Sequence, residues 1–196
     1  MSEVSRRSLL QRIALAATAG GLSLEAAQHV HGVATQEKTA TGGYKPKGLN
    51  AHEYKTLERL ADYIVPADDV SVGAVAAGAP EFIDLLASQN PQLLAIYTGG
   101  IAWLDFAMQR RYSADFLGAK GEQQTGLLDL IAFRKNESAE LGPGIRFFDW
   151  ARRMVVDAFY TSPAGIKDIG YMGNTAVSKF EVPQEAIDYA VKRSPA

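Results

Sequence analysis

Cysteine is absent from this chain of 196 residues, and histidine is scarce. Without cysteine there are no disulfides, no thiolate metal sites and no iron–sulfur clusters. The three histidines are His29, His31 and His52, and the first two lie close to the amino terminus. One histidine is too few for a multi-histidine metal centre in the rest of the chain. The sequence therefore predicts no metal site, and at His29 and His31 it favours a flexible segment over a stray metal ion.

A strong net charge is absent too. The chain has 20 Lys and Arg residues against 22 Asp and Glu residues, which gives a net charge of −2 at pH 7. The basic residues are scattered among the acidic ones, so the chain has no basic field for a nucleic acid. Sustained alternation of apolar and polar residues is missing, as are repeats of about 20–50 residues. We therefore expect an all-α protein that does not bind nucleic acid.

The motifs of a self-sufficient enzyme are also missing. The segment from Gly170 to Asn174 lacks the three-glycine spacing and the preceding strand of a dinucleotide site. No G-x-S-x-G elbow is present, and a Ser–His–Asp triad would have to use His52 on the exposed side of a helix. The Cys-x-x-Cys-His motif that attaches haem is excluded by the lack of cysteine. We therefore predict no catalytic and no cofactor-binding residues in this chain.

Neighbouring carboxylates leave one enzymatic alternative open. Asp68 with Asp69, or Asp105 with Asp149, could in principle perform acid–base chemistry. Surface carboxylates are far more often solvated or paired with basic residues. The loop around Asp68 and Asp69 also lacks the alternating oxygen ligands and the closing Glu of an EF-hand.

The amino terminus has a short basic and apolar pattern. Arg6, Arg7 and Arg12 precede an apolar run from Ile13 to Leu24. As a helix this run would span about 18 Å at about 1.5 Å per residue, well short of a bilayer core of about 30 Å. The pattern is typical of a twin-arginine signal over residues 1–34, which exports folded proteins, with Arg6 and Arg7 recognised by the translocon. A basic amphipathic helix is the alternative.

Small residues offer two cleavage sites for such a signal. Gly32-Val33-Ala34 is the better match to a signal peptidase site, and Leu24-Glu25-Ala26 is a poorer one. Residues 35–48 are rich in Thr, Gly and Lys without periodicity, so we expect a linker there.

The remaining residues, 49–196, show apolar residues at helical spacing. Asn50 and Glu53 form a capping-box pattern, and Pro66 stops the helix that follows. Gly99 and Gly100 weaken the middle of a later helix, where we expect a kink or close helix packing. We predict a single compact all-α domain of about six to eight helices with long loops. Its helices are expected over residues 50–65, 80–87, 91–112, 122–134, 144–159 and 183–193.

An aromatic segment rich in proline and glycine follows the strongest of these helices. It contains Phe159-Tyr160-Thr161-Ser162-Pro163 and Gly170-Tyr171-Met172-Gly173-Asn174. Tyrosine is enriched at protein interfaces, and glycine permits close approach of a backbone. We predict a partner interface at Tyr160, Pro163, Gly170, Tyr171, Gly173 and Asn174. An ordered loop that closes the helical core is an equally favoured and compatible interpretation.

Three groups of residues resemble signatures of the gluconate 2-dehydrogenase subunit 3 family. The first is the helix ending Ala61-Asp62-Tyr63-Ile64-Val65-Pro66, and the second comprises Phe116-Leu117, Gln123-Gln124 and Leu127-Leu128. The third is the aromatic pair of motifs after Phe159. The resemblance covers about residues 49 to 190, whereas the loop from Val70 to Ala79 departs from the pattern and carries no information on substrate.

The resemblance implies a role for the chain. Members are small all-helical subunits, often with twin-arginine leaders, that accompany a large FAD-dependent dehydrogenase of the glucose–methanol–choline class and often a membrane-bound cytochrome c subunit. The chain is thus expected to be a non-catalytic periplasmic subunit that escorts its partner through the export channel, with FAD in the partner. A stand-alone periplasmic helical enzyme and a free binding module are the alternatives.

Overall fold

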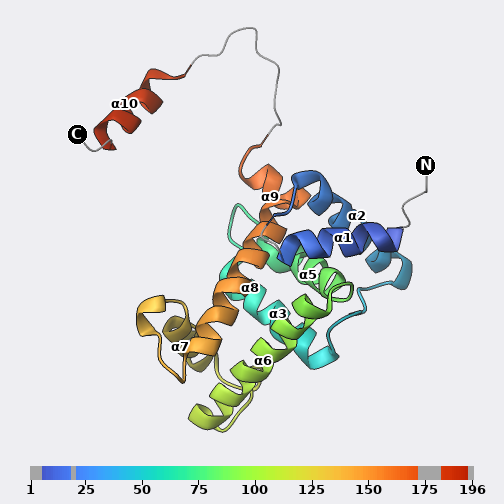
Figure 1. Ribbon diagram of the computed structural model, residues 1–196, viewed down its shortest axis with the longest axis vertical. Helices are drawn as coiled ribbons and strands as arrows, with labels where there is room; N and C mark the ends of the chain where they lie inside the picture. Colours follow the sequence, from blue (N-terminus) through green and yellow to red (C-terminus); the bar gives the residue numbers. More distant parts are fainter. Residues whose placement is uncertain (1–5, 19–20, 172–181, 194–196) are drawn as a thin grey trace.

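The computed structural model describes residues 6–18, 21–171 and 182–193, and within them it is helical without any strand (Figure 1). Eight of its ten α-helices have seven residues or more, so the predicted fold class is confirmed. The helices are α1 (Arg6–Thr18), α2 (Leu24–Thr41), α3 (Ala51–Ile64), α4 (Gly73–Ala76), α5 (Ala79–Ala87), α6 (Pro91–Tyr112), α7 (Gly121–Ile131), α8 (Gly142–Tyr160), α9 (Pro163–Asp168) and α10 (Gln184–Arg193). None of the described helices is long and apolar enough to cross a membrane.

Helix α5 lies at the centre of the body. All nine of its residues are buried, and it contacts α1, α2, α3, α4, α6 and α8. Its sequence, Ala-Pro-Glu-Phe-Ile-Asp-Leu-Leu-Ala, is apolar on nearly every side, which is the pattern of a helix surrounded by others. The two polar side chains within it, Glu81 and Asp84, are buried with partners from preceding segments.

The two longest helices, α6 and α8, pack closely because each contributes a glycine to the contact. A Cβ atom on Gly100 of α6 would collide with the ring of Phe147, and one on Gly144 of α8 would collide with the ring of Trp103. The sequence predicted a kink or close packing at Gly99 and Gly100, and the structure has close packing at Gly100. Each helix thus presents a glycine to an aromatic ring of the other.

Helix α3 begins and ends as the sequence predicts. The side chain of Asn50 accepts hydrogen bonds from the backbone N–H groups of His52 and Glu53, and the carboxylate of Glu53 accepts one from the backbone of Asn50. These reciprocal bonds are the expected capping box.

The loop after Pro66 contains the short helix α4. Helix α7 ends at Ile131, three residues before its expected end, and a 3₁₀ turn follows at Arg134–Asn136.

The amino-terminal region differs in part from the expectation. Within the apolar run from Ile13 to Leu24, α1 ends at Thr18 and Ser23 caps the start of α2. The prediction of a linker over residues 35–48 was wrong for residues 35–41, because α2 continues to Thr41. Gly42 then caps the helix in a left-handed conformation. Helix α2 is rich in small residues and threonine, so its apolar side is hard to recognise in the sequence. On that side Ala27, Val30, His31 and Ala34 are buried against the body.

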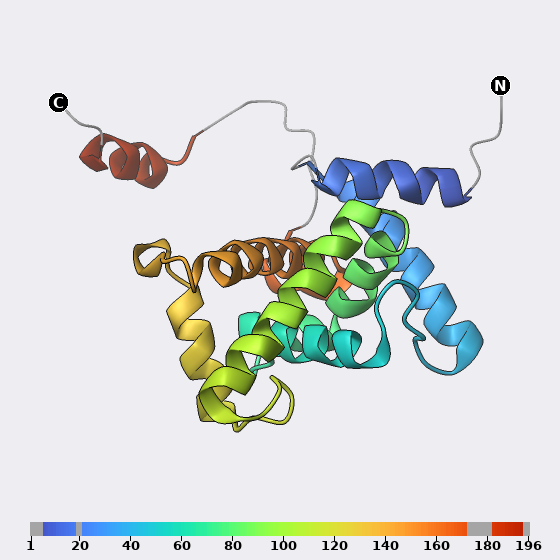
Figure 2. The same ribbon diagram turned by 60° about the horizontal axis from the view of Figure 1, so that its bottom comes forward.

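Both amino-terminal helices therefore pack on the helical body. Figure 2 shows α1 lying along one edge of the bundle, where it contacts α2, α5 and α6. Leu10, Ile13, Ala14 and Ala17 of α1 are buried in this contact. The amide of Asn90, which also caps α6, donates a hydrogen bond to the backbone oxygen of Ala14 at 3.1 Å.

Helix α10 matches its predicted position and lies apart from the bundle in Figure 1. Every residue described between Val182 and Arg193 is exposed. Ile187 and Val191 lie on one side of this helix, and the ring of Tyr189 stacks under the guanidinium of Arg193.

Candidate partner interface

A buried histidine ties α2 to the carboxyl end of α8. His31 is 7% exposed, and its Nε2 atom donates to the backbone oxygen of Ala158 at 2.9 Å. Its ring also packs on Phe82 of α5. Burial lowers the pKa of His31 below 6.5, although the bond to Ala158 and the charge of Glu81 act in the opposite direction. The prediction of a flexible segment at His29 and His31 was wrong, because the imidazole of His31 is a neutral part of the core.

The predicted interface begins at the end of α8. Tyr160 is its last residue and is 40% exposed, whereas its neighbour Phe159 is buried and meets the Tyr160 ring edge to face. Ser162 then caps α9, since its Oγ accepts from the N–H of Gly165 at 3.0 Å. Pro163 is the exposed first residue of α9. Phe159 and Ser162 are thus buried and close the core, whereas Tyr160 and Pro163 are exposed.

The next predicted residues follow α9. Gly170 has a φ of +63°, a left-handed conformation that favours glycine, and Tyr171 is 44% exposed. Gly173 and Asn174 lie outside the described residues. Four of the six predicted contact residues are thus exposed along one stretch of chain, from the end of α8 to the residue after Gly170. The segment therefore closes the core with one side and leaves Tyr160 and Tyr171 exposed on the other, and the partner interface stays a prediction.

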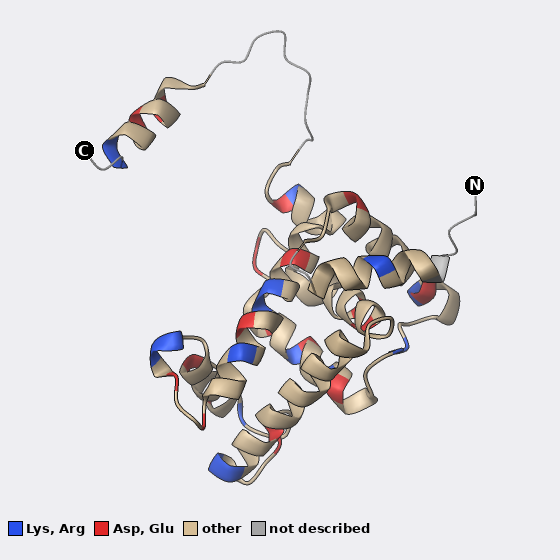
Figure 3. Ribbon diagram, viewed as in Figure 1, with Lys and Arg blue, Asp and Glu red and all other residues tan. Residues whose placement is uncertain are grey.

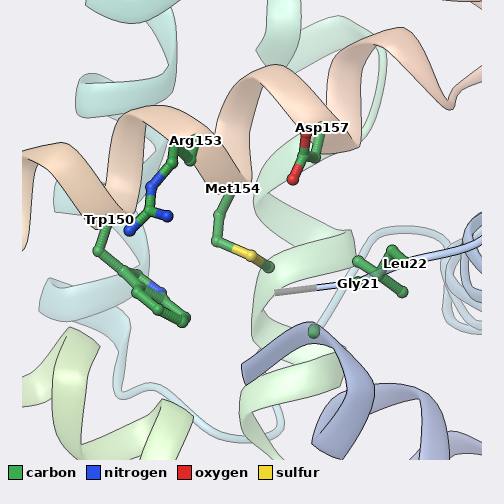
Figure 4. Close-up of a pocket in the computed structure, with 7 residues that line it drawn as sticks. Gly21, Leu22, Trp150, Arg153, Met154 and Asp157 are labelled. Atoms are coloured by element: carbon green, nitrogen blue, oxygen red, sulfur yellow. The ribbon is translucent and has the colours of Figure 1, made fainter. Parts of the chain in front are cut away.

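A small cavity separates the amino-terminal segment from α8 (Figure 4). It has a volume of about 150 Å³ and is lined by Gly21 and Leu22 on one side and by Trp150, Met154 and Asp157 on the other. Burial raises the pKa of Asp157, opposed by the charge of Arg153. Arg6 and Arg7 are the first residues of α1, and their side chains lie outside the described part of the structure.

A buried carboxylate fastens the segment after α2. Asp84 of α5 is fully buried and accepts four hydrogen bonds, all from residues 44–49. Oδ2 accepts from the Tyr44 hydroxyl and the Lys47 N–H, and Oδ1 accepts from the N–H groups of Gly48 and Leu49. Burial, followed by the charge of Asp84, raises the pKa of Tyr44, so its hydroxyl stays a donor. Asp84 was not predicted as a structural residue, because seven of the eight other residues of α5 are apolar or proline and give no sign of its partners.

An acidic group beside α2 was also missed. Glu81 of α5 is buried, and its Oε1 atom lies 2.8 Å from Nζ of Lys38 in α2. Burial and the negative charge of Glu81 raise the pKa of the nearby Glu58. The sequence around Lys38 and Glu81 gives no sign of this pair, because the two residues are 43 positions apart and lie on different helices.

The comparison with family models matches residues 51–178 to a model described as gluconate 2-dehydrogenase subunit 3. The chain belongs to the gluconate 2-dehydrogenase subunit 3 family. The match begins at α3 and includes α3 to α9, whereas α1, α2 and α10 lie outside it. No curated protein and no solved structure gives a significant match.

Within this subunit 3 chain, the residues that carried the resemblance hold three segments together. The hydroxyl of Tyr63 donates to Oε1 of Gln124 at 2.6 Å, and the amide of Gln124 donates to the backbone oxygen of Phe116. Gln124 and Phe116 are buried, so these bonds satisfy polar groups in the interior. The signature residues therefore join α3, α7 and the connector before α7, which is a structural role.

The carboxylates considered for a stand-alone enzyme bond to other groups. Asp68 accepts hydrogen bonds from the N–H groups of Val70 and Ser71. Asp105 accepts from Phe116 N–H and lies 2.7 Å from Nε2 of His52, while Asp149 is surrounded by arginines of α8 and the 3₁₀ turn. Although partial burial acts to raise it, the hydrogen bond from Arg134 and the neighbouring positive charges hold the pKa of Asp149 below its ordinary value. Figure 3 shows these charges of both signs along α8. Asp149 is therefore held by ion pairs with arginines, and Asp105 is held by hydrogen bonds.

No group of three His, Asp or Glu side chains that could hold a metal ion occurs within the described ranges. A Ser–His–Asp triad would need a serine beside His52. Among the described residues, the side chain that bonds to the His52 ring is Asp105. Family membership indicates an accessory subunit of a dehydrogenase complex.

Proposed function

We propose that this subunit is the export escort and stabilising partner of a large FAD-dependent sugar or sugar-acid dehydrogenase. Membership of the gluconate 2-dehydrogenase subunit 3 family supports the association with such a complex. The chain itself contains no dinucleotide fingerprint, so FAD and the catalytic base are assigned to the partner. A membrane-bound cytochrome c subunit completes the complex in this proposal, and the whole assembly acts in the periplasm.

The observation that carries the escort proposal is the arginine pair on a helix attached to a folded body. Arg6 and Arg7 begin α1, and the apolar side of α1 is buried against the same bundle that matches the family model. A partner bound to this bundle would be exported together with the small subunit by means of the small subunit's signal. Folded export is needed when a protein without its own signal acquires a flavin before it crosses the membrane.

The test is a double substitution of the arginine pair. The guanidinium of arginine forms a planar fork that lysine lacks, so Arg6→Lys with Arg7→Lys should retain the charge but abolish recognition by the translocon. We expect both this subunit and its large partner to stay in the cytoplasm, measured as flavin-dependent dehydrogenase activity in the periplasmic and cytoplasmic fractions. Arg12→Lys is the matched control, because Arg12 is an exposed arginine of the same helix outside the pair.

Normal periplasmic activity in the double variant would contradict the escort role. A second measurement separates the enzymatic alternative. The purified small subunit alone should show neither flavin absorbance nor turnover of sugars with an artificial electron acceptor. The complex with its partner should show both. Turnover by the isolated chain would instead establish a stand-alone enzyme.

A further inference from the structure

A groove lies between α6 and α8 on the surface of the body. It has a volume of about 360 Å³ and is lined mainly by apolar groups, including Ile96, Gly99 and Trp103 of α6 and Phe147 and Trp150 of α8. These residues lie outside the tyrosine segment, and none of them was predicted from the sequence to contact a partner. Aromatic rings in a surface groove are the side chains that most often anchor a protein partner.

The floor of this groove is built by the two glycine–aromatic contacts of the fold. Phe147 lies over Gly100, and Trp103 lies over Gly144, in each case where a Cβ atom would collide with the ring. The rings are therefore seated by the packing of α6 on α8 before any partner arrives. Trp150 completes the wall, and its Nε1 atom is buried without a hydrogen-bond partner.

The outer side of α6 beside the groove has the spacing of a helix-packing seam. Ala95, Gly99, Ala102 and Phe106 are exposed and recur at intervals of four, three and four residues. This is the interval of positions that contact a second helix in coiled coils. A glycine within a helix costs about 1 kcal/mol relative to alanine. Gly99 has open space around its Cα atom, so nothing in the described fold requires a glycine there.

Arginines border the groove. Arg146 lines it directly, with a side chain that is 70% exposed, and its carboxylate partner Glu137 is 3.7 Å away. Arg153 lies over the ring of Trp150 and is 61% exposed, and it shares the carboxylate of Asp149 with two other arginines. Arg110 lies over Phe106 at the other end of the seam. The positive charge of these arginines is therefore incompletely neutralised, which favours a binding partner with acidic groups next to the groove.

We propose that this groove, lined by Ile96, Gly99, Trp103, Phe147 and Trp150, is the surface that binds the large flavoprotein subunit. The occupant is an apolar helix of that subunit, flanked by Asp or Glu residues that meet Arg146 and Arg153. This inference rests on the proposed function. A second copy of the chain is a poorer occupant, because a two-fold contact through the groove would place one arginine border against another.

The first test fills the groove at its open glycine. Gly99→Leu adds a side chain where the described structure leaves space, so the variant should fold. Gly32→Leu is the matched control, because Gly32 is also an exposed helical glycine with open space around it, on α2. Each full-length variant is coexpressed in the cytoplasm with the large flavoprotein subunit of the dehydrogenase, and copurified flavin is measured per small subunit. Gly99→Leu should reduce it by about tenfold or more, as expected for disruption of an interface centre. Gly32→Leu should leave it unchanged.

The second test reverses one charge of the border. Arg153→Glu should weaken binding of the flavoprotein and reduce the dependence of its Kd on salt concentration. Arg59→Glu is the control, because Arg59 likewise stacks on an aromatic ring, Tyr63, and has a weak carboxylate contact at 3.8 Å. Thermal unfolding of the isolated variants verifies that all of them are folded.

The outcomes distinguish this proposal from the escort function. If the wild-type chain binds the flavoprotein and Gly99→Leu and Arg153→Glu bind it equally well, the groove is not the interface, while the escort function stands. If the wild-type chain binds no flavoprotein, both proposals fail. If the isolated wild-type chain is a dimer that Gly99→Leu converts to a monomer, the occupant is a second copy and the proposal is overturned.

Discussion

The strongest prediction about stability concerns the buried carboxylate of Asp84. Asp84→Asn replaces one carboxylate oxygen by an NH₂ group of almost the same size. The remaining amide oxygen can still accept from the N–H groups of Gly48 and Leu49, which bond to Oδ1 in the wild-type chain. The new NH₂ group then faces two donors, the Tyr44 hydroxyl and the Lys47 N–H. The hydroxyl can rotate and accept, but the backbone N–H has no alternative role.

The magnitude follows from these four bonds. A buried donor left without a partner costs about 1–3 kcal/mol, and a hydrogen bond to a charged group contributes about 1.5–3 kcal/mol. The amide is easier to bury than the carboxylate, which offsets part of the loss. We expect a decrease of about 2–3 kcal/mol in the free energy of unfolding, which corresponds to about 4–12 °C in Tm for a protein of this size. Tyr44→Phe, which removes only one of the four donors, should cost about 1 kcal/mol.

Thermal and urea unfolding followed by circular dichroism will measure both variants. The segment from residue 44 to 49 should also exchange its amide hydrogens faster in Asp84→Asn, because the lost bonds hold that segment on α5. A stability within about 0.5 kcal/mol of the wild-type chain would refute the reasoning, since such a change is typical of surface substitutions. Equal losses in Asp84→Asn and Tyr44→Phe would show that only the hydroxyl bond contributes.

Other predictions concern packing and pH. Gly100→Ala should destabilise the chain by about 1–3 kcal/mol through overpacking against Phe147, whereas Gly99→Ala should stabilise it by about 0.5–1 kcal/mol, as measured by urea unfolding. Because burial lowers the pKa of His31, the unfolded chain binds a proton more readily than the folded chain as the pH falls through 6.5. The free energy of unfolding should therefore decrease from about pH 7 to about pH 5, and His31→Gln, which can still donate to Ala158, should remove part of this dependence. An unchanged pH profile in that variant would show that His31 does not titrate differently on folding.

The fold could be predicted well where local signals and burial agree. The capping box at Asn50, the proline at the start of α6 and the apolar stripe of α8 are local patterns, and the structure has helices at all three. In each of these cases the physical cause lies within a few residues of the effect. At Gly99 and Gly100 the sequence predicted a kink or close packing, and the distant contact of Gly100 with Phe147 decides for close packing.

The errors arose where the cause lies far away in sequence. Helix α2 has weak apolar periodicity, and it is held by His31 on Ala158 and by Lys38 on Glu81, contacts across 127 and 43 residues. The exposure of Tyr160 and Tyr171 agrees with the tyrosine segment chosen from the sequence, whereas their contact with a partner stays a prediction. The groove required the pairing of α6 with α8 to bring Trp103 beside Phe147 and Trp150. Periodicity within one helix does not indicate which other helix it will meet.

The two reciprocal contacts between glycines and aromatic rings also fix how α6 and α8 can move. Sliding one helix along the other by a turn would take both rings off their glycines at once, onto residues that have side chains. The two helices therefore form a rigid unit whose surface has its final shape before assembly. A partner that binds such a surface loses little entropy in ordering it, so most of the energy of its contacts is retained as affinity. Substitutions at Gly100 or Gly144 should thus weaken assembly through flexibility, even though neither residue needs to touch the partner.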